Sequence, residues 1–193
     1  MSGPVNLAPG FERGPDGVAR PAWANGNELM RDYYDSEWGF PVRDERGLFE
    51  RLSLEAFQSG LAWSTILVKR PAFRRAFANF DVEMLAEWGE HDIEQLLLDA
   101  SIVRNRPKIE ATLNNAQACL KLREHGGLAK LVWTYASTQP LTVRSHPEAP
   151  SETDASRELA RELKRHSFRH VGPVTIQALM DATGVAGIRD GVS

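Results

Sequence analysis

The stretch KRHSFRHVGPVTIQALMDATG, residues 164–184, holds the features that decide the fold. Basic residues lead up to Gly172, and the apolar residues after it recur at the spacing of a helix. Pro173 suits the first turn of such a helix, and Gly184 suits the position just beyond its last turn. The preceding residues 154–166 also have a helical pattern, with an acid at the start and basic residues at the end. The sequence therefore predicts two helices joined by a short turn.

Helical patterns continue through the rest of the chain. The segments that show them are residues 44–70, 70–80, 82–100, 105–126 and 126–136. Pro71, Pro107 and the pair Gly126 and Gly127 mark the expected breaks. No segment shows the alternation of apolar and polar residues that is typical of a strand. We therefore expect an all-α fold.

A chain of 193 residues is long enough for one domain with a substantial core. Residues 1–20 are rich in glycine and proline and poor in large apolar side chains, so we expect a flexible N-terminal tail there. We expect residues 21–186 to form the helical domain, with a long polar connection over residues 137–156 and the hairpin turn at about residues 168–176. Residues 187–193 are expected to form a C-terminal tail.

The net charge of the chain is −3, so a general basic surface for nucleic acid is absent. Any binding of phosphate must come from a local basic patch or from backbone N–H groups. One such patch precedes Gly172 and sets Arg157, Arg161, Lys164, Arg165 and Arg169 against Glu158 and Glu162. Basic residues at the end of a helix also compensate the helix dipole. The patch by itself therefore does not decide between an anion site and ordinary stabilisation.

The sequence argues against several classes of protein. The single cysteine, Cys119, cannot form an intramolecular disulfide and fits the cytoplasm, where we expect the protein to act. No signal-peptide pattern opens the chain, and no apolar run approaches the roughly 20 residues of a membrane span, so we expect no membrane partner. Gly-rich nucleotide-binding loops and the serine motif of α/β-hydrolases are missing. Five histidines and one cysteine do not form a standard zinc site.

Glu55 is an acidic residue at a position where the helical pattern predicts burial. When residues 48–66 are placed on one helix, the inward stripe consists of Leu48, Leu52, Glu55, Ser59, Ala62 and Ile66. A buried carboxylate is unfavourable unless it has a partner or a ligand, so Glu55 among small residues indicates a cavity. Trp63, about two turns further along the same helix, is expected to line that cavity. The alternatives are an ion pair with Arg51 or a place at the solvent edge of the stripe.

A second unusual stretch is RDYYDSEWG, residues 31–39. It combines Tyr33, Tyr34 and Trp38 with two acids and is too polar for a core segment. Aromatic faces with a few polar groups are typical of a pocket for a flat heterocycle. Ordinary packing at the end of a helix is the alternative interpretation of these residues.

Four stretches of the sequence, in a consistent order along the chain, resemble the motifs of one protein family. They are YYDSEWG (33–39), LEAFQSGLAW (54–63), IVRNRPKIEATLNNAQA (102–118) and FRHVGPVTIQALMDATG (168–184). Together they resemble the DNA-3-methyladenine glycosylase I family of the helix-hairpin-helix superfamily, from about Arg20 to Gly184. The resemblance implies a compact helical bundle in two lobes, with the base pocket between them.

The resemblance also implies an activity. A monofunctional hydrolase of base-excision repair would cleave the N-glycosidic bond of alkylated purines such as 3-methyladenine in double-stranded DNA, releasing the base and leaving an abasic site. Glu55 is then the catalytic residue that holds the edge of the base, and Tyr33, Trp63 and Trp23 are the aromatic residues that bind it. We expect a monomer. A non-catalytic or altered-specificity binder of alkylated DNA is the alternative, and a helical scaffold without nucleic acid is a third.

In this superfamily the hairpin turn offers backbone N–H groups to a DNA phosphate. The physical basis is the partial positive charge and the unsatisfied donors at the start of a helix. The resemblance therefore assigns DNA binding to the backbone of Gly172, Val174 and Thr175 and to the side chains of Arg165 and Arg169.

The chain departs from the family's pattern at the zinc ligands of the family. The positions that correspond to its two cysteines and two histidines hold Pro21, Tyr34, Arg189 and Ser193. We therefore expect a divergent member without zinc or any other cofactor. Its termini are expected to be held by packing around Trp23 and Tyr34 instead.

Three further positions bear on the site. Ala56 replaces a family glycine beside Glu55, which predicts a narrower or reshaped pocket and leaves the range of substrates open. Asp190 follows Gly172 by 18 residues, near the spacing of a catalytic aspartate in other members of the superfamily. The family resembled here lacks that aspartate, so we expect Asp190 to be exposed and Asp181 to lie on the surface of the last helix.

Overall fold

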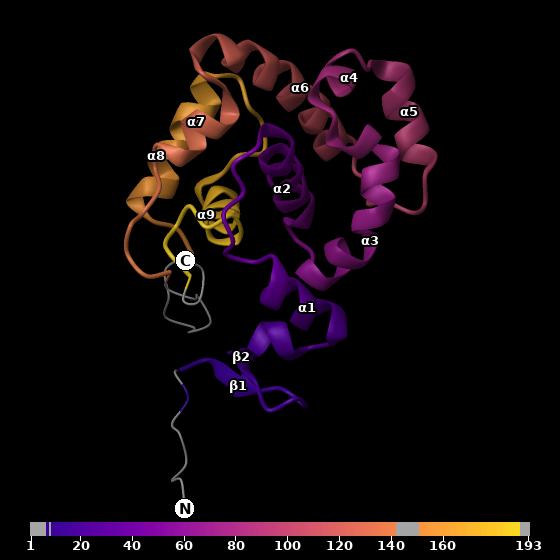
Figure 1. Ribbon diagram of the computed structural model, residues 1–193. Helices are drawn as coiled ribbons and strands as arrows, with labels where there is room; N and C mark the ends of the chain where they lie inside the picture. Colours follow the sequence, from indigo (N-terminus) through magenta and orange to yellow (C-terminus); the bar gives the residue numbers. More distant parts are fainter. Residues whose placement is uncertain (1–6, 8, 142–150, 190–193) are drawn as a thin grey trace, which may run out of the picture.

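Helices make up nearly all of the regular structure (Figure 1). The computed structural model describes residue 7, residues 9–141 and residues 151–189. Its α-helices are α1 (Glu28–Ser36), α2 (Glu45–Gln58), α3 (Trp63–Ala76), α4 (Val82–Ala86), α5 (Glu90–Leu98), α6 (Arg106–Leu122), α7 (Gly127–Trp133), α8 (Asp154–Arg165) and α9 (Pro173–Ala182). Short 3₁₀ segments are η1 (Ala22–Asn25), η2 (Ala78–Phe80) and η3 (Arg123–His125). The predicted helical architecture is confirmed.

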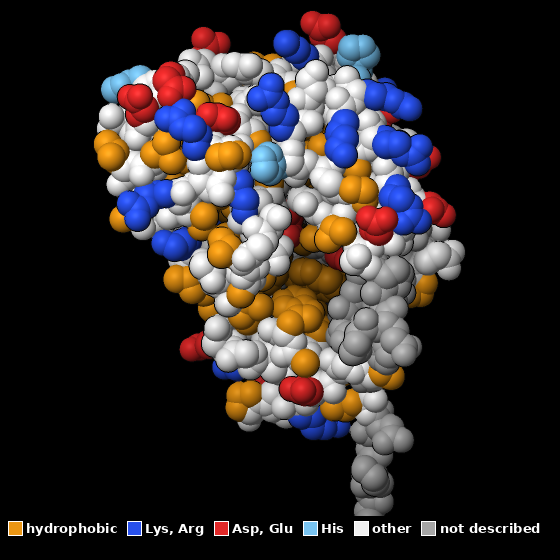
Figure 2. Space-filling model, turned by 180° about the vertical axis from the view of Figure 1, so that it is seen from behind, with side chains coloured by type: hydrophobic (Ala, Val, Ile, Leu, Met, Phe, Trp, Pro, Cys, Tyr) orange, Lys and Arg blue, Asp and Glu red, His pale blue; other side chains and the backbone are white. Residues whose placement is uncertain are grey.

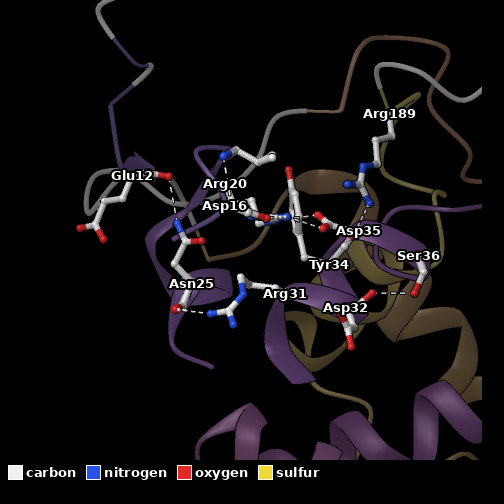
Figure 3. Close-up of polar contacts among 11 residues, drawn as sticks. Glu12, Asp16, Arg20, Asn25, Arg31, Asp32, Tyr34, Asp35, Ser36 and Arg189 are labelled. Atoms are coloured by element: carbon white, nitrogen blue, oxygen red, sulfur yellow. Dashed lines mark hydrogen bonds and ion pairs between the residues drawn. The ribbon is translucent and has the colours of Figure 1, made fainter. Parts of the chain in front are cut away.

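One small sheet accompanies the helices, in which β1 (Phe11–Arg13) and β2 (Ala19–Pro21) pair antiparallel. Arg20 on β2 is only 4% exposed. Its guanidinium donates to Asp16 at 2.9 Å and to Asp35 on α1 at 2.8 Å (Figure 3). A buried guanidinium requires acceptors, and these contacts fix the strand pair to α1. The predicted tail is therefore wrong for residues 9–20, while residues 1–6 and 8 lie outside the described residues.

Side-chain caps set the beginnings of five of the described helices. The side chains of Asn27, Asp44, Asp81, Asn105 and Thr153 accept hydrogen bonds from backbone N–H groups in the first turns of α1, α2, α4, α6 and α8, respectively. Such caps satisfy donors that have no partner within the helix. The helix starts predicted close to residues 44, 105 and 154 are confirmed.

Two of the predicted helical runs are divided. Residues 44–70 form two helices, because the chain turns between Gln58 and Trp63, and Gly60 in that turn has φ +82°. A positive φ favours glycine, which has no Cβ to clash with the backbone. Residues 82–100 are likewise divided into α4 and α5.

The break expected at Pro71 does not occur. α3 continues through Pro71 to Ala76. The proline removes one helical hydrogen bond, but the turn beyond it is held by core packing. Phe73 is fully buried, and its ring lies 4.7 Å from that of Phe57 between centroids. Packing therefore outweighs the local cost of the proline.

Two apolar clusters divide the molecule into lobes. The larger lobe is built around α2, with phenylalanines from α2, α3 and η2 in its core. The smaller lobe contains the strand pair, η1 and α1, and its cluster consists of Ala24, Met30, Tyr33, Tyr34, Trp38, Leu67 and Ala182. Trp63 packs against both clusters. The larger and smaller lobes are the upper and lower parts of Figure 1.

The hairpin between α8 and α9 has the form predicted from residues 164–184. Pro173 is the first residue of α9, and Gly184 follows its end with φ +72°. Asn115 of α6 fixes the turn, because its side chain accepts from the Arg169 N–H at 2.7 Å and donates to the Arg169 carbonyl at 3.0 Å. Asn115 is buried, so these bonds satisfy an amide that water cannot reach.

The C-terminal segment packs against the chain that follows α7. Ile188 forms a parallel bridge with Pro140, and the Leu141 N–H donates to the Ile188 carbonyl at 2.7 Å. Residues 142–150 of the predicted connection at 137–156 and residues 190–193 of the predicted C-terminal tail, with Asp190 and Ser193, lie outside the described residues. None of the helices in the described ranges is both long and apolar enough to cross a membrane.

Candidate active site

A cavity of about 510 Å³ lies where the two lobes meet. In Figure 2 it is the hollow with an apolar floor in the middle of the face shown. Five helical elements contribute to its wall, which is lined by Trp23, Met30, Tyr33, Trp38, Glu55, Gln58, Ala62, Trp63, Ser64, Ala178 and Asp181. The volume lies in the range of about 300–1,000 Å³ that is typical of pockets for small ligands.

Glu55 lies on α2 and lines this cavity, as the inward stripe predicts. Its residue surface is only 6% exposed. The alternative ion pair with Arg51 is not formed among the described residues, because the Arg51 guanidinium instead donates to Glu37 at 2.5 Å. Arg70 donates to the same carboxylate at 2.7 Å. Glu37 thus holds both arginines, and Glu55 remains directed at the cavity.

Burial raises the pKa of Glu55 to about 8, the positive charge of Arg51 opposes this shift, and the negative charge of Asp181 adds to it. In the empty cavity near neutral pH the carboxyl is therefore mostly protonated. A positively charged ligand favours the ionised form, because its attraction to the carboxylate offsets the solvation that the carboxylate loses on burial. The acid is thus suited to a cation.

Aromatic side chains form much of the remaining wall. Tyr33 and Trp63 lie with ring centroids 5.4 Å apart and planes inclined by 43°. Trp23 meets Trp38 edge to face at 5.6 Å. Burial raises the pKa of the Tyr33 phenol, so it stays neutral and can donate a hydrogen bond. The structure therefore brings Tyr33, Trp63 and Trp23 to one cavity with Glu55, and their roles in binding a base remain predictions.

Trp63 reaches the cavity by a different route from the one expected. It begins α3 after the turn at residues 59–62, rather than continuing the helix of Glu55. Lys108 of α6 holds this turn, because its ammonium donates to the carbonyls of Phe57 at 2.9 Å and Ser59 at 2.6 Å. A cation at the end of a helix binds carbonyls that have no helical partner. Lys108 thereby positions one wall of the cavity, a role that its sequence position does not reveal.

Asp181 is the main correction to the predicted site. It does not lie on the surface: its residue surface is 6% exposed, and it lines the cavity. The Gln177 amide donates to its carboxylate at 2.9 Å. The sequence contains a signal for this, because α9 is apolar on nearly all sides and a polar residue in such a helix is buried.

Ala56 lies beside Glu55 on α2. Its residue is buried on α2, and it is not one of the residues that line the cavity. The narrower or reshaped pocket expected from this substitution stays a prediction.

The hairpin presents the backbone groups that the sequence indicates. The first helical hydrogen bond of α9 joins the Ile176 N–H to the Gly172 carbonyl at 2.9 Å. The N–H groups of Val174 and Thr175 come before it in the chain and therefore have no acceptor within the helix. A Cβ built on Gly172 would meet no atom within 4 Å. The helix start is therefore open to an approaching anion.

The basic patch before the turn is partly neutralised within its own helix. Arg165 pairs with Glu162 at 2.6 Å, and Arg161 pairs with Glu158 at 2.8 Å. Such exposed pairs are weak, with stabilisation of about 0–1 kcal/mol, and they exchange readily for another anion. Lys164 and Arg169 are exposed and form no ion pair among the residues that the structure describes.

Three of the four positions that correspond to the family's zinc ligands are described, and they do not fit a zinc ion. Pro21 offers no ligand atom, and the Arg189 guanidinium lies 4.2 Å above the Tyr34 ring (Figure 3). Arg189 also donates to the backbone carbonyls of Tyr34 and Trp38. Trp23 packs edge to face on Tyr34 at 5.5 Å, which confirms the predicted packing around these two residues.

Comparison with known proteins adds the remaining evidence. The sequence model described as methyladenine glycosylase matches residues 23–189. The chain belongs to this family. It is 37% identical to DNA-3-methyladenine glycosylase 1 of Escherichia coli (strain K12), over 87% of this chain and 91% of that protein. The motif-based resemblance is thereby confirmed.

Solved structures agree with the family assignment. A crystal structure of 3-methyladenine DNA glycosylase I superposes with a TM-score of 0.81 at 36% identity, over 88% of this chain and 93% of that chain. A tyrosine-to-phenylalanine variant of such an enzyme in complex with 3-methyladenine gives 0.80 at 32% identity, over 89% and 92%. This chain therefore has the methyladenine glycosylase fold. The range that the family model matches, residues 23–189, contains every residue that lines the cavity.

Neutralising Glu55 is expected to remove a pH dependence of stability. The carboxyl has a pKa of about 8 when folded and an ordinary value of 4.5, so between these values the folded state retains a proton that the unfolded chain loses. The free energy of unfolding should fall across this range, by at most about 1.4 kcal/mol per pH unit. In Glu55→Gln the fall should be absent.

Urea unfolding at several pH values measures this effect. Glu94→Gln, at an exposed position on α5, is the control and should keep the wild-type profile. A wild-type stability that does not fall between pH 5 and 8 would contradict the raised pKa of Glu55.

Proposed function

We propose that this protein hydrolyses the N-glycosidic bond of alkylated purines, with 3-methyladenine as the leading substrate, in double-stranded DNA. The observation that carries the proposal is the Glu55 carboxylate, buried in an aromatic cavity between the lobes of a methyladenine glycosylase fold. An enzyme of this kind must take its target base out of the helical stack and hold it in a pocket. The products are a free base and an abasic site, so the enzyme acts in base-excision repair.

The chemistry requires little acid catalysis. Alkylation at N3 gives the base a positive charge, so the base is already a good leaving group. The C1′–N bond breaks with its electron pair passing to the base, which becomes neutral, and water adds to C1′ and loses a proton. Glu55 accepts hydrogen bonds from the edge of the cationic base, and the rings of Tyr33, Trp63 and Trp23 enclose it.

Double-stranded DNA is the partner that this reaction requires. The open start of α9 supplies backbone donors for a phosphate, and Lys164 and Arg169 supply positive charge beside it. Lys and Arg side chains also lie on the face that holds the hollow (Figure 2). One chain supplies the whole cavity wall, which supports action as a monomer. We propose the cytoplasm as the site of action, which the single cysteine supports, and we assign no membrane partner.

We also propose that the protein works without zinc or another cofactor. The support is the arrangement of Pro21, Tyr34 and Arg189, which joins the C-terminal segment to α1 through packing and hydrogen bonds. No reaction step above involves a metal.

Glu55→Gln is expected to lower the rate of release of 3-methyladenine from methylated DNA by about 10- to 100-fold. The substitution removes a charge-assisted hydrogen-bond acceptor, which is worth about 1.5–3 kcal/mol. Chromatographic measurement of the released base under single-turnover conditions tests it, with Glu94→Gln as the matched control. Tight binding of methylated DNA without base release by the wild type would support the alternative, a non-catalytic binder.

Charge reversal at both Lys164 and Arg169 is expected to weaken DNA binding and to flatten its salt dependence. Each lost phosphate contact should reduce the slope of log K against log salt by about 1. Fluorescence anisotropy with DNA that contains an abasic analogue measures this slope between about 50 and 200 mM salt. Lys121→Glu, at an exposed position near the end of α6, is the control. Equal slopes in all three proteins would exclude the hairpin as the DNA contact.

Chelation is expected to change neither base release nor thermal unfolding, because the tether at the termini is made of protein groups. Arg189→Ala should destabilise the fold by about 1–3 kcal/mol, since two carbonyls lose their donor. Urea unfolding measures the loss. Stoichiometric zinc in the purified protein, found by elemental analysis, would contradict the proposal.

A further inference from the structure

One acid of the stretch at residues 31–39 has no part in the proposed reaction. Glu37 follows the last turn of α1, and its carboxylate joins α1 to α2 and α3 (Figure 1). Arg51 of α2 donates to it at 2.5 Å, and two nitrogens of Arg70 of α3 donate to it at 2.7 Å each. Burial opposes ionisation of Glu37, but the two arginines outweigh burial and lower its pKa to about 2. Glu37 is therefore a fixed negative charge near neutral pH.

Arg51 has a second possible acceptor on its own helix. It precedes Glu55 by four residues on α2, a spacing at which an arginine and a glutamate can pair. The structure directs its Nη2 to Glu37 instead, while its Nη1 is buried and has no acceptor among the described residues. A buried donor without an acceptor is unfavourable. Arg51 is therefore expected to turn to Glu55 when Glu37 does not hold it.

A pair between Arg51 and Glu55 would change the cavity. Glu55 lines the cavity, whereas Arg51 does not, and its guanidinium lies 5.4 Å from the centroid of the Tyr33 ring. An arginine bound to Glu55 would occupy the oxygens that accept hydrogen bonds and would neutralise their charge. A positively charged base would then meet a neutral pair. Recognition of a cation thus requires that Arg51 is held elsewhere.

The titratable groups that act on Glu55 come from three helices. Arg51 on α2 lowers the pKa of Glu55, and Asp181 on α9 raises it. Tyr33 on α1 lines the same cavity, and the negative charge of Glu55 raises the pKa of its phenol. Of these groups, Arg51 is the one that Glu37 binds. Asp181 and Tyr33 are unchanged in every variant below, so their effects are common to all of them.

We propose that Glu37 is a positioning residue, which keeps the Arg51 guanidinium away from Glu55 so that the Glu55 carboxylate stays available to a positively charged base. The proposal rests on the proposed function and deepens it, because it names a contact on which recognition of the cation depends. Glu37 does not line the cavity, so it acts through Arg51 and not by touching the base. Arg70 supports this contact, since its two hydrogen bonds hold the Glu37 carboxylate against α3.

Glu37→Gln tests the proposal, because glutamine keeps the size of the side chain and removes its charge. Arg51 should then pair with Glu55 and lower the pKa of that carboxyl. The wild-type fall of the unfolding free energy, which extends to about pH 8, should end at a lower pH and be smaller. Release of 3-methyladenine from methylated DNA at neutral pH should fall about tenfold or more, as the base loses a charge-assisted acceptor. Urea unfolding and chromatography of the released base measure the two effects.

Removing the arginine as well should reverse both effects. In the double variant Glu37→Gln/Arg51→Met, methionine fills the buried space without a charge. Base release should recover most of the lost rate. The fall of stability with pH should extend beyond that of the wild type, because the charge that opposes the raised pKa of Glu55 is gone. A merely structural role for Glu37 does not predict this shift in opposite directions.

Glu50→Gln is the matched control. It breaks another ion pair between α2 and α3, in which Arg74 donates to Glu50 at 2.9 Å, and it leaves Arg51 bound to Glu37. Its pH profile and its rate of base release should be those of the wild type.

Two results overturn the proposal. One is a folded Glu37→Gln variant with the pH profile and base release of the wild type. The other is a loss of release that Arg51→Met does not restore in the double variant. If Glu37→Gln does not fold, the single variant Arg51→Met decides: it should retain base release and move the fall of stability to higher pH, and loss of release or an unchanged profile refutes the proposal.

The outcome is separable from that of the proposed function, since the pH profile of unfolding is measured without DNA. A shift to lower pH in Glu37→Gln that reverses in the double variant, without base release by the wild type, would overturn the glycosylase assignment and leave the role of Glu37 toward Arg51 intact. Base release by the wild type without any such shift would overturn only the role of Glu37.

Discussion

The burial of the Glu55 carboxylate is the constraint on which the cavity depends. Its nearest cation, Arg51, is bound to Glu37, so the arginine lowers the cost of burying the acid without forming an ion pair with it. The carboxyl therefore faces a hollow and retains its proton until a positive charge arrives. Hydrophobic packing of α2 in the larger lobe keeps it there, because moving Glu55 into water would also expose the apolar residues beside it.

Polar and aromatic contacts hold the smaller lobe together and attach the C-terminal segment to it. Arg20 joins the strand pair to α1 through Asp35. Arg189 joins the C-terminal segment to the same helix through the face of Tyr34 and two carbonyls. Planar guanidinium groups suit such places, since one side chain stacks on a ring and donates several hydrogen bonds. The small lobe thus needs only a small apolar cluster of its own.

Periodicity alone located the residue at the centre of the site but misjudged its surroundings. Glu55 stands out because an acid interrupts an apolar stripe. Trp63 was expected on the same helix, whereas a turn held by Lys108 carries it into the cavity from the next one. Asp181 was expected at the surface, whereas the packing of α9 buries it beside the cavity. The strand pair was missed because three-residue strands are too short to show alternation.

The sequence by itself determined most of the helices, the hairpin with Pro173 and Gly184 at the two ends of α9, and the family, because propensity and turn chemistry act between residues a few positions apart. Only the tertiary structure decided which polar groups share the cavity. Glu55 and Asp181 are 126 positions apart along the chain, and whether each is buried depends on the helices that cover it rather than on its own neighbours. The electrostatic coupling of these two acids follows from packing alone.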